Sequence, residues 1–208
     1  MKTLLKWVTP NGEALIAEIA RVSNPGNQDN PDYAKLLSYM VQHNHWSPFE
    51  MVSACFEINT TRDIGRQILR HRSFSFQEFS QRYAAVNALP PAELRECRTQ
   101  DAKNRQNSIV SDDCTLDAAW EALQRTVESV TAGAYRNALE MGIAKEQARA
   151  LLPEGLTPSR IYMSGTLRSW MHYCKLRTGV ETQKEHREIA AEISDTLRQC
   201  FPLVWAAL

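Results

Sequence analysis

Five arginines between residues 62 and 82 form a local excess of positive charge in a chain that carries 24 basic and 24 acidic side chains overall. Only two acidic residues share this stretch. A guanidinium donates paired hydrogen bonds to phosphate and keeps its charge when partly buried. The stretch therefore predicts a phosphate-binding surface, although a solvated arginine face on a helix has the same composition. These residues are Arg62, Arg66, Arg70, Arg72 and Arg82.

Gln67, Arg70 and His71 are spaced to share one face of a predicted helix, because side chains three and four residues apart are neighbours there. Ser80 and Arg82 follow after a polar and aromatic segment. Such a set can hold the phosphate of a nucleotide while it presents an amide to the base.

A second basic group lies in RSWMHYCKLR, residues 168–177, where Arg168 and His172 are one helical turn apart and Arg177 ends the predicted helix. Arg149 stands in the last turn of a short predicted helix, where a cation also interacts well with the helix dipole. The aromatic residues of 168–177 are explained equally well as core, and His172 as a hydrogen-bonded histidine.

The motifs of several common enzyme classes are missing. The sequence has no GxGxxG loop, no phosphate-binding P-loop, no GxSxG and no HExxH. Its cysteines form no CxxC pair, which argues against a zinc site or a disulfide framework, so no bound metal is expected. We expect each cysteine to act as a small buried apolar residue: Cys55, Cys97, Cys114, Cys174 and Cys200.

Composition indicates a globular protein of one domain, residues 1–208, with 43% hydrophobic and 23% charged residues. A neutral balance with a pI near 7.0 argues against a dedicated nucleic-acid binder. No stretch approaches the roughly 20 apolar residues that cross a bilayer, and the N-terminus lacks the pattern of a signal peptide. We therefore expect a cytoplasmic protein without membrane contact.

Hydrophobic periodicity predicts mostly helices, with a half-buried strand over 51–58 and an extended segment or loop after residue 72. Residues 88–113 are the least defined region. The fold class that follows is α+β, mostly helical, with a small central sheet built from N-terminal and mid-chain strands. The expected helices cover 12–23, from Asn30–Pro31 to His43, 61–72, from Thr115 to Gly142, 144–152, 166–177 and 181–200.

The string RHRSFSFQEFSQRY, residues 70–83, resembles the signature of the flavin-dependent thymidylate synthases, which is Arg-His-Arg, seven residues, then Ser. Further blocks follow in the order of that family, and the resemblance spans about residues 13–190. The blocks are ARVS at 20–23, HWSPFE at 45–50, RALLP at 149–153 and LRSWMHYCKLR at 167–177. The chain departs from the family pattern at Met51, Gln77, Thr166 and Glu181.

The resemblance implies synthesis of dTMP from dUMP, with methylenetetrahydrofolate as one-carbon donor. NADPH would reduce a bound FAD, and the flavin would supply the hydride. No cysteine nucleophile is needed, which agrees with the scattered cysteines. The family also implies a homotetramer whose active sites lie between subunits.

The same resemblance assigns roles by position. Arg177 would be the catalytic residue, because a guanidinium beside the uracil ring stabilises charge that develops there. Ser80 and Arg82 would hold the phosphate, with Arg149 contributed by another subunit. The expected dUMP contacts are Gln67, Arg70, Glu78, Phe79, Ser80, Gln81, Arg82, Arg149 and Arg177. The expected FAD contacts are Ser23, His45, Ser47, Arg70, His71, Arg72, Glu78, Thr166, Arg168 and His172.

Two alternatives stay open from the residues alone. One is a flavoprotein that oxidises NADPH without methyl transfer. The other is a non-catalytic nucleotide- or RNA-binding protein that uses the arginines of 62–82, against which the neutral charge of the whole chain counts.

Overall fold

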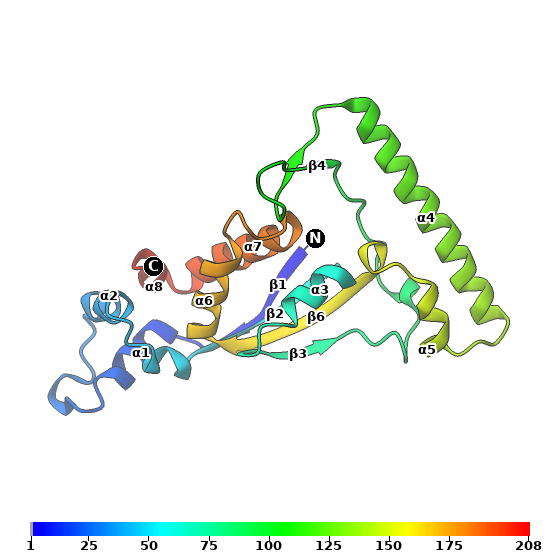
Figure 1. Ribbon diagram of the computed structural model, residues 1–208. Helices are drawn as coiled ribbons and strands as arrows, with labels where there is room; N and C mark the ends of the chain where they lie inside the picture. The colour runs from blue at the N-terminus through cyan, green and yellow to red at the C-terminus, as the bar shows by residue number, and fades with distance from the viewer. Residues whose placement is uncertain (1) are drawn as a thin grey trace.

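A four-stranded antiparallel sheet forms the centre of the computed structural model, which describes residues 2–208 (Figure 1). The strand order is β1-β2-β6-β3, so the strand nearest the N-terminus lies at one edge. This arrangement confirms the predicted α+β class. The strands are β1 Lys2–Val8, β2 Ser53–Thr61, β3 Ser75–Glu78 and β6 Pro158–Thr166.

Strand β2 has the alternation that its sequence predicts. Phe56 and Ile58 are fully buried beneath the helices, whereas Glu57 lies on the opposite, open face. On that open face, Tyr162 Oη donates a hydrogen bond to Glu57 Oε2 at 3.0 Å. One face is therefore apolar and covered by helices, and the other is a surface of paired polar groups.

Helices α3 Arg62–Ile68, α6 Leu167–Arg177 and α7 Lys184–Cys200 cover the buried face of the sheet (Figure 1). Trp170 is fully buried at this boundary, and its Nε1–H donates to Ala54 O at 3.1 Å. Burial of this indole removes a large apolar area from water without leaving its N–H unpaired. The remaining short helices, α1 Gly12–Ala20, α2 Ala34–Gln42 and α8 Pro202–Ala206, lie at one end of the molecule (Figure 1).

Several predicted helix boundaries are wrong. Helix α1 ends at Ala20 instead of residue 23, and α7 begins at Lys184 instead of residue 181. Helix α2 begins at Ala34 because Asn30 Oδ1 accepts the backbone N–H of Asp32 at 2.9 Å, which makes a local turn instead of a helix cap. Helix α3 begins after Thr61 as predicted but ends at Ile68 instead of near Arg72.

The least defined part of the sequence begins an arm, residues 98–152, that extends away from the sheet (Figure 1). Its hairpin pairs β4 Arg98–Gln100 with β5 Ser108–Val110. The long helix α4, Cys114–Glu140, follows, and Asp113 Oδ1 caps it by accepting the N–H of Thr115 at 2.9 Å. Gly142, in the left-handed region with φ +82°, ends this part of the chain as predicted, before α5 Lys145–Ala148.

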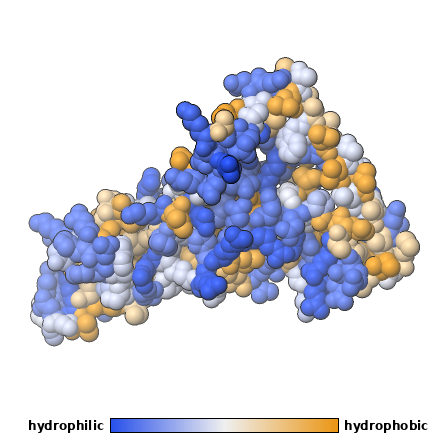
Figure 2. All heavy atoms as spheres, in the orientation of Figure 1, coloured by the Kyte–Doolittle hydropathy of each residue, from blue (hydrophilic) through white to orange (hydrophobic). Residues whose placement is uncertain are grey.

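Helix α4 exposes most of its apolar side chains, and Figure 2 shows hydrophobic residues gathered along this arm. Leu123 is 62% exposed and Val130 is 66% exposed, whereas only Gln124 and Tyr135 of this helix are buried. A contiguous apolar face of this kind marks an interaction surface.

All five cysteines are free, but they are not all buried as expected. Cys55 and Cys174 are buried in the core, whereas Cys114 is exposed as the first residue of α4. No helix within residues 2–208 combines the length and apolar character that crossing a membrane requires. The cytoplasmic location stays a prediction.

Candidate active site

Arg177 and His71 are in direct contact where α6 meets the turn after α3. Arg177 Nε donates to His71 Nε2 at 2.9 Å, and the His71 ring packs edge-on against Tyr173 at 4.9 Å between centroids. Burial, followed by the charges of Arg177 and His172, lowers the pKa of His71 to about 4. His71 is therefore neutral near pH 7, and its proton is on Nδ1 because Nε2 accepts from the guanidinium.

Gln67 joins this group from the last turn of α3. Its amide contacts His186 of α7 and Gln183, the residue just before that helix, with Gln67 Oε1 lying 3.3 Å from His186 Nδ1. Since α3 ends at Ile68, Arg70 lies in the following turn, exposed, and does not share a helical face with Gln67 as the spacing suggested. Arg72 is exposed in the same turn.

A second group surrounds a cavity of about 1110 Å³ between α2, α6 and the last residues of the chain. Arg168 Nη1 donates to Glu50 Oε1 at 2.6 Å, and Thr166 Oγ1 donates to Glu50 Oε2 at 2.8 Å. The hydrogen bond from Arg168 is the main reason that the pKa of Glu50 is lowered. Thr166 also caps α6, because its Oγ1 accepts the N–H of Ser169 at 3.3 Å.

His45 and Ser47, two of the expected FAD contacts, are not among the residues that line this cavity, whereas their neighbours Asn44 and Trp46 are. Asn44 adopts a left-handed conformation with φ 57°, and the N–H of His45 reaches back to Met40 O at 2.8 Å. This turn is a typical helix C-terminal motif. It leads the chain into the short helical turn Ser47–Met51, next to Trp46, which lines the cavity.

The cavity residues fit an anionic dinucleotide such as a flavin cofactor. Arg168, His172 and Lys175 lie four and three residues apart on α6, so one helix face presents three basic groups to the cavity. Ser73 and Ser169 add hydroxyls, and Trp46 adds an aromatic surface. The volume exceeds the roughly 300–1,000 Å³ usual for pockets that bind small ligands.

A third group lies at the base of the arm. Arg82 Nε is 3.2 Å from Glu146 Oε2, and Arg149 Nε donates to the backbone oxygen of the same Glu146 at 3.3 Å. Ser80 lies in the turn before Arg82, and its carbonyl accepts the N–H of Tyr83 at 3.1 Å. Gln81 is buried, and its Nε2 has no partner among the described residues.

Of the ten expected FAD contacts, Thr166, Arg168 and His172 line the cavity, whereas the other seven do not. Three predicted site residues lie apart from all the groups described above. Glu78 on β3 accepts from Ser159 Oγ at 2.8 Å, on the side of the strand that faces α3. Phe79 continues the sheet, with its N–H on Arg160 O at 2.8 Å. Ser23 is exposed in the turn after α1 and does not line the cavity beside Arg168.

The predicted site residues therefore form separate groups instead of one site. Figure 1 shows α5, whose Glu146 contacts both Arg82 and Arg149, at the opposite end of the molecule from α2. Within residues 2–208, no described hydrogen bond or ion pair joins Arg82 or Arg149 to Gln67 or Arg177.

Comparison with known proteins identifies the family of this chain. The family model described as thymidylate synthase complementing protein matches residues 3–203. A flavin-dependent thymidylate synthase from Synechocystis sp. is 50% identical over 196 residues, covering 94% of this chain and 89% of the relative. The chain belongs to the flavin-dependent thymidylate synthases. The family predicted from residues 70–83 is thereby confirmed, and with it an enzyme of the methyltransferase class.

Other members of the family and one solved structure agree. A probable flavin-dependent thymidylate synthase from Paramecium bursaria Chlorella virus 1 is 48% identical over 200 residues, covering 94% of this chain and 90% of the relative. The UMP/dUMP methylase PolB from Streptomyces cacaoi, solved with 5-Br dUMP, superposes with a TM-score of 0.84 at 26% identity. That likeness covers 99% of this chain and 93% of the methylase.

Sequence reasoning missed several residues of these groups. Glu50 and Trp46 belong to the quoted block HWSPFE, and Lys175 lies one turn after His172, so local signals for them existed. For His186 no local signal exists, because a histidine on the apolar face of α7 reads as an ordinary core residue.

Proposed function

We propose that this enzyme converts dUMP to dTMP, with methylenetetrahydrofolate as one-carbon donor and NADPH-reduced FAD as the source of hydride. The observation that carries the proposal is the 2.9 Å hydrogen bond between Arg177 and His71. By family resemblance, Arg177 faces the uracil and His71 faces the flavin. A hydride can pass between the two ligands only if their binding surfaces adjoin, and the contact between Arg177 and His71 supports this arrangement.

On the nucleotide side, Arg177 offers its terminal N–H groups to the uracil, since a guanidinium has five N–H donors and His71 takes the one on Nε. The charge stabilises negative charge that develops on the ring. Gln67 supplies an amide beside it, held by α7.

On the cofactor side, Arg168, His172 and Lys175 would meet the phosphates of the dinucleotide, and Trp46 would pack on a ring. When bound, the flavin supplies the hydride for the transferred carbon. Ion pairing between Arg168 and Glu50 holds the guanidinium at the wall of the cavity, and only one of its terminal nitrogens donates to that carboxylate.

Active sites between the subunits of a homotetramer are part of the proposal. The exposed apolar face of α4 supports association, and a shared site is supported by the lack of any described hydrogen bond or ion pair between Arg82 or Arg149 and the Gln67 and Arg177 group within residues 2–208. In this arrangement, the arginines at the base of one arm hold the phosphate of a nucleotide whose base lies against Arg177 of another subunit.

The test is an assay of purified protein with dUMP, NADPH and methylenetetrahydrofolate carrying ¹³C in the transferred methylene. We expect a flavin absorption spectrum and dTMP labelled in its methyl group. Peroxide formation without labelled dTMP would favour the flavoprotein that only oxidises NADPH. Colourless protein that binds polynucleotide with a steep salt dependence would favour the RNA-binding alternative.

A further inference from the structure

A continuous series of hydrogen bonds connects Gln67 with a carboxylate on α7. Gln67 Nε2 donates to Gln183 Oε1 at 2.7 Å, and Gln183 Nε2 donates to Glu185 Oε2 at 2.9 Å. On the other side of the amide, Gln67 Oε1 lies 3.3 Å from His186 Nδ1, and His186 Nε2 lies 3.0 Å from Tyr173 Oη.

The carboxylate sets the direction of every bond in this series. An ionised Glu185 only accepts, so Gln183 must turn its NH₂ group toward it and its oxygen toward Gln67. Gln67 must then donate to Gln183 and accept from His186. The proton of His186 is consequently on Nδ1, and its bare Nε2 accepts from the hydroxyl of Tyr173.

Glu185 stays ionised because two arginines surround it, Arg95 from the segment before the arm and Arg98, which is the first residue of the arm. Arg95 Nη1 lies 3.1 Å from Glu185 Oε2, and Arg98 forms an ion pair with the other carboxylate oxygen. Burial alone raises the pKa of Glu185, but its own backbone N–H, the Arg95 charge and the Gln183 amide together lower it.

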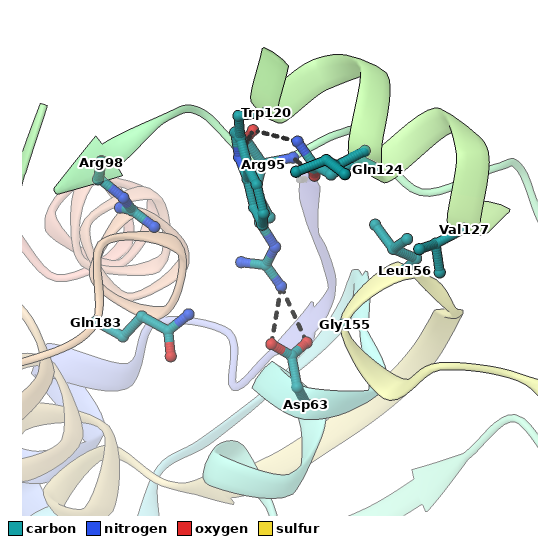
Figure 3. A pocket seen from close by; sticks show the side chains of 10 residues that line it. Asp63, Arg95, Arg98, Trp120, Gln124, Val127, Gly155, Leu156 and Gln183 are labelled. Carbon is teal, nitrogen blue, oxygen red and sulfur yellow. Dashed lines mark hydrogen bonds and ion pairs between the residues drawn. The ribbon is translucent and has the colours of Figure 1, made fainter. Parts of the chain in front are cut away.

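Arg95 is itself held firmly (Figure 3). Its Nη2 is 2.9 Å from Asp63 Oδ1, and its backbone is bracketed by Gln124, which accepts from Arg95 N at 2.7 Å and donates to Arg95 O at 2.9 Å. Residues 88–113 therefore hold the charged end of the series in place.

His186 completes the series as a neutral group. Its side chain is 0% exposed between α3, α6 and α7. Burial, together with the charges of Arg177 and His71, lowers its pKa to about 3. A neutral imidazole has one donor and one acceptor, and both are used here.

We propose that His186 is a positioning residue that, as the second hydrogen-bond partner beside Gln183, holds the Gln67 amide in one orientation and thereby makes the enzyme select uracil over cytosine. This inference rests on the proposed function, in which Gln67 contacts the base. The series leaves one N–H of Gln67 for the ligand, and a carbonyl of uracil accepts it. Cytosine has an amino group in place of O4 of uracil, so an amide that can turn its oxygen to the ligand tolerates cytosine better.

The test compares two replacements of His186 in the flavin-loaded oligomer. His186→Asn keeps a donor near the position of Nδ1, whereas His186→Gln keeps a polar group near Nε2 and loses the donor to Gln67. Titration calorimetry measures the dissociation constants of dUMP, dCMP and 2-deoxyribose 5-phosphate.

We expect His186→Gln to lower the ratio of dUMP to dCMP affinity about tenfold, because the Gln67 amide loses one of the two hydrogen bonds that hold it, and only the bond to Gln183 remains. Binding of the sugar phosphate should stay within about twofold, and His186→Asn should restore most of the selectivity. Equal weakening of all three ligands, or an unchanged ratio in His186→Gln, overturns the inference.

Tyr173→Phe provides a second variant that does not alter the imidazole. It removes the hydroxyl that donates to Nε2 and so supports the tautomer of His186 with its proton on Nδ1, and we expect a loss of selectivity of about threefold. Tyr135→Phe is the matched control, since Tyr135 is also buried and its hydroxyl has no partner among the described residues. An unchanged ratio of dUMP to dCMP affinity in Tyr173→Phe counts against the inference even where His186→Gln does not fold.

The unsubstituted enzyme separates the two proposals. If it shows no preference for dUMP over dCMP, the proposed function fails as well. If it prefers dUMP and His186→Gln does not change that preference, only the inference about His186 is refuted.

Discussion

Arg177 donates the hydrogen of its Nε to Nε2 of His71 across 2.9 Å, so one residue expected to face the nucleotide holds the tautomer of one expected to face the flavin. The bond also orients the guanidinium, because a planar group bound through Nε projects both terminal nitrogens away from the histidine.

Replacement of Arg177 should abolish most of the activity without releasing the flavin. We expect Arg177→Ala to lower kcat for dTMP formation by about 100-fold or more, since a donor to developing charge is lost. Arg177→Lys should not restore activity, because one ammonium cannot bind His71 and the ring together. Rapid-quench kinetics and the ratio of flavin to protein absorbance measure the two effects. Full activity of Arg177→Ala would refute the catalytic assignment.

Arg82→Ala should act on substrate affinity instead. A phosphate contact is present in both the ground and the transition state, so KM for dUMP should rise about 10- to 100-fold while kcat stays within about twofold. Arg66→Ala is the matched control, because Arg66 forms an exposed ion pair with Glu154 at the same 3.2 Å as Arg82 with Glu146. A comparable rise of KM in Arg66→Ala would show that the effect is only general loss of positive charge.

A subunit that carries only Arg82→Ala and a subunit that carries only Arg177→Ala should complement each other in a mixed oligomer. If one chain supplies the phosphate group and another supplies the guanidinium at the base, co-expressed mixtures contain some sites with neither substitution. We expect such mixed oligomers, purified through two different tags, to form dTMP at low dUMP concentrations where both parents are inactive. Activity no greater than the average of the parents would contradict a site shared between chains.

Arg168→Ala should reduce flavin binding at the cavity beside α6. The substitution removes one of the three basic groups on that helix face and leaves Glu50 without its ion-pair partner. We expect at least about a tenfold weaker flavin affinity, measured by fluorescence titration of the stripped protein. Arg198→Ala removes an exposed arginine of α7 that pairs with Asp195 at 3.6 Å, and flavin affinity should not change in it.

The unfolding free energy should fall as the pH is lowered from 7 to 5. His71 and His186 are neutral in the folded protein, with pKa lowered to about 4 and about 3, whereas the unfolded chain takes up protons near 6.5. Since the unfolded state binds more protons in this window, stability decreases by about 2 kcal/mol for each such histidine between pH 7 and pH 5.

Urea denaturation at pH 7, 6 and 5 measures this dependence. The carboxylates whose pKa is lowered, Glu50, Glu57 and Glu185, lose their stabilising ionisation only at lower pH, so they do not mask it. His186→Asn should remove about half of the slope. A flat profile over this range would contradict the burial of two neutral histidines.

The local sequence pattern was sufficient to predict the structure wherever residues close together in the sequence determine it. The alternation around Phe56 predicted β2, and the position of Gly142 predicted the end of the long helix. It failed where a distant residue decides. Gln67 and His186 are 119 residues apart, and nothing near either one indicates that they meet. The apolar face of α4 likewise predicted a helix but not that this face stays exposed, because periodicity does not say what covers it.

Phe79 and Arg160 are joined by a backbone hydrogen bond of 2.8 Å between neighbouring strands, and all residues between them, the arm included, leave the sheet and return to it at this point. The sheet itself already holds the two ends together. Each doubling of such a loop adds only about 0.6 kcal/mol of closure entropy. Insertions and deletions in this loop therefore change the free energy of folding only slightly. We expect differences in chain length among relatives to fall in the β4–β5 hairpin while β2 and β6 keep their length.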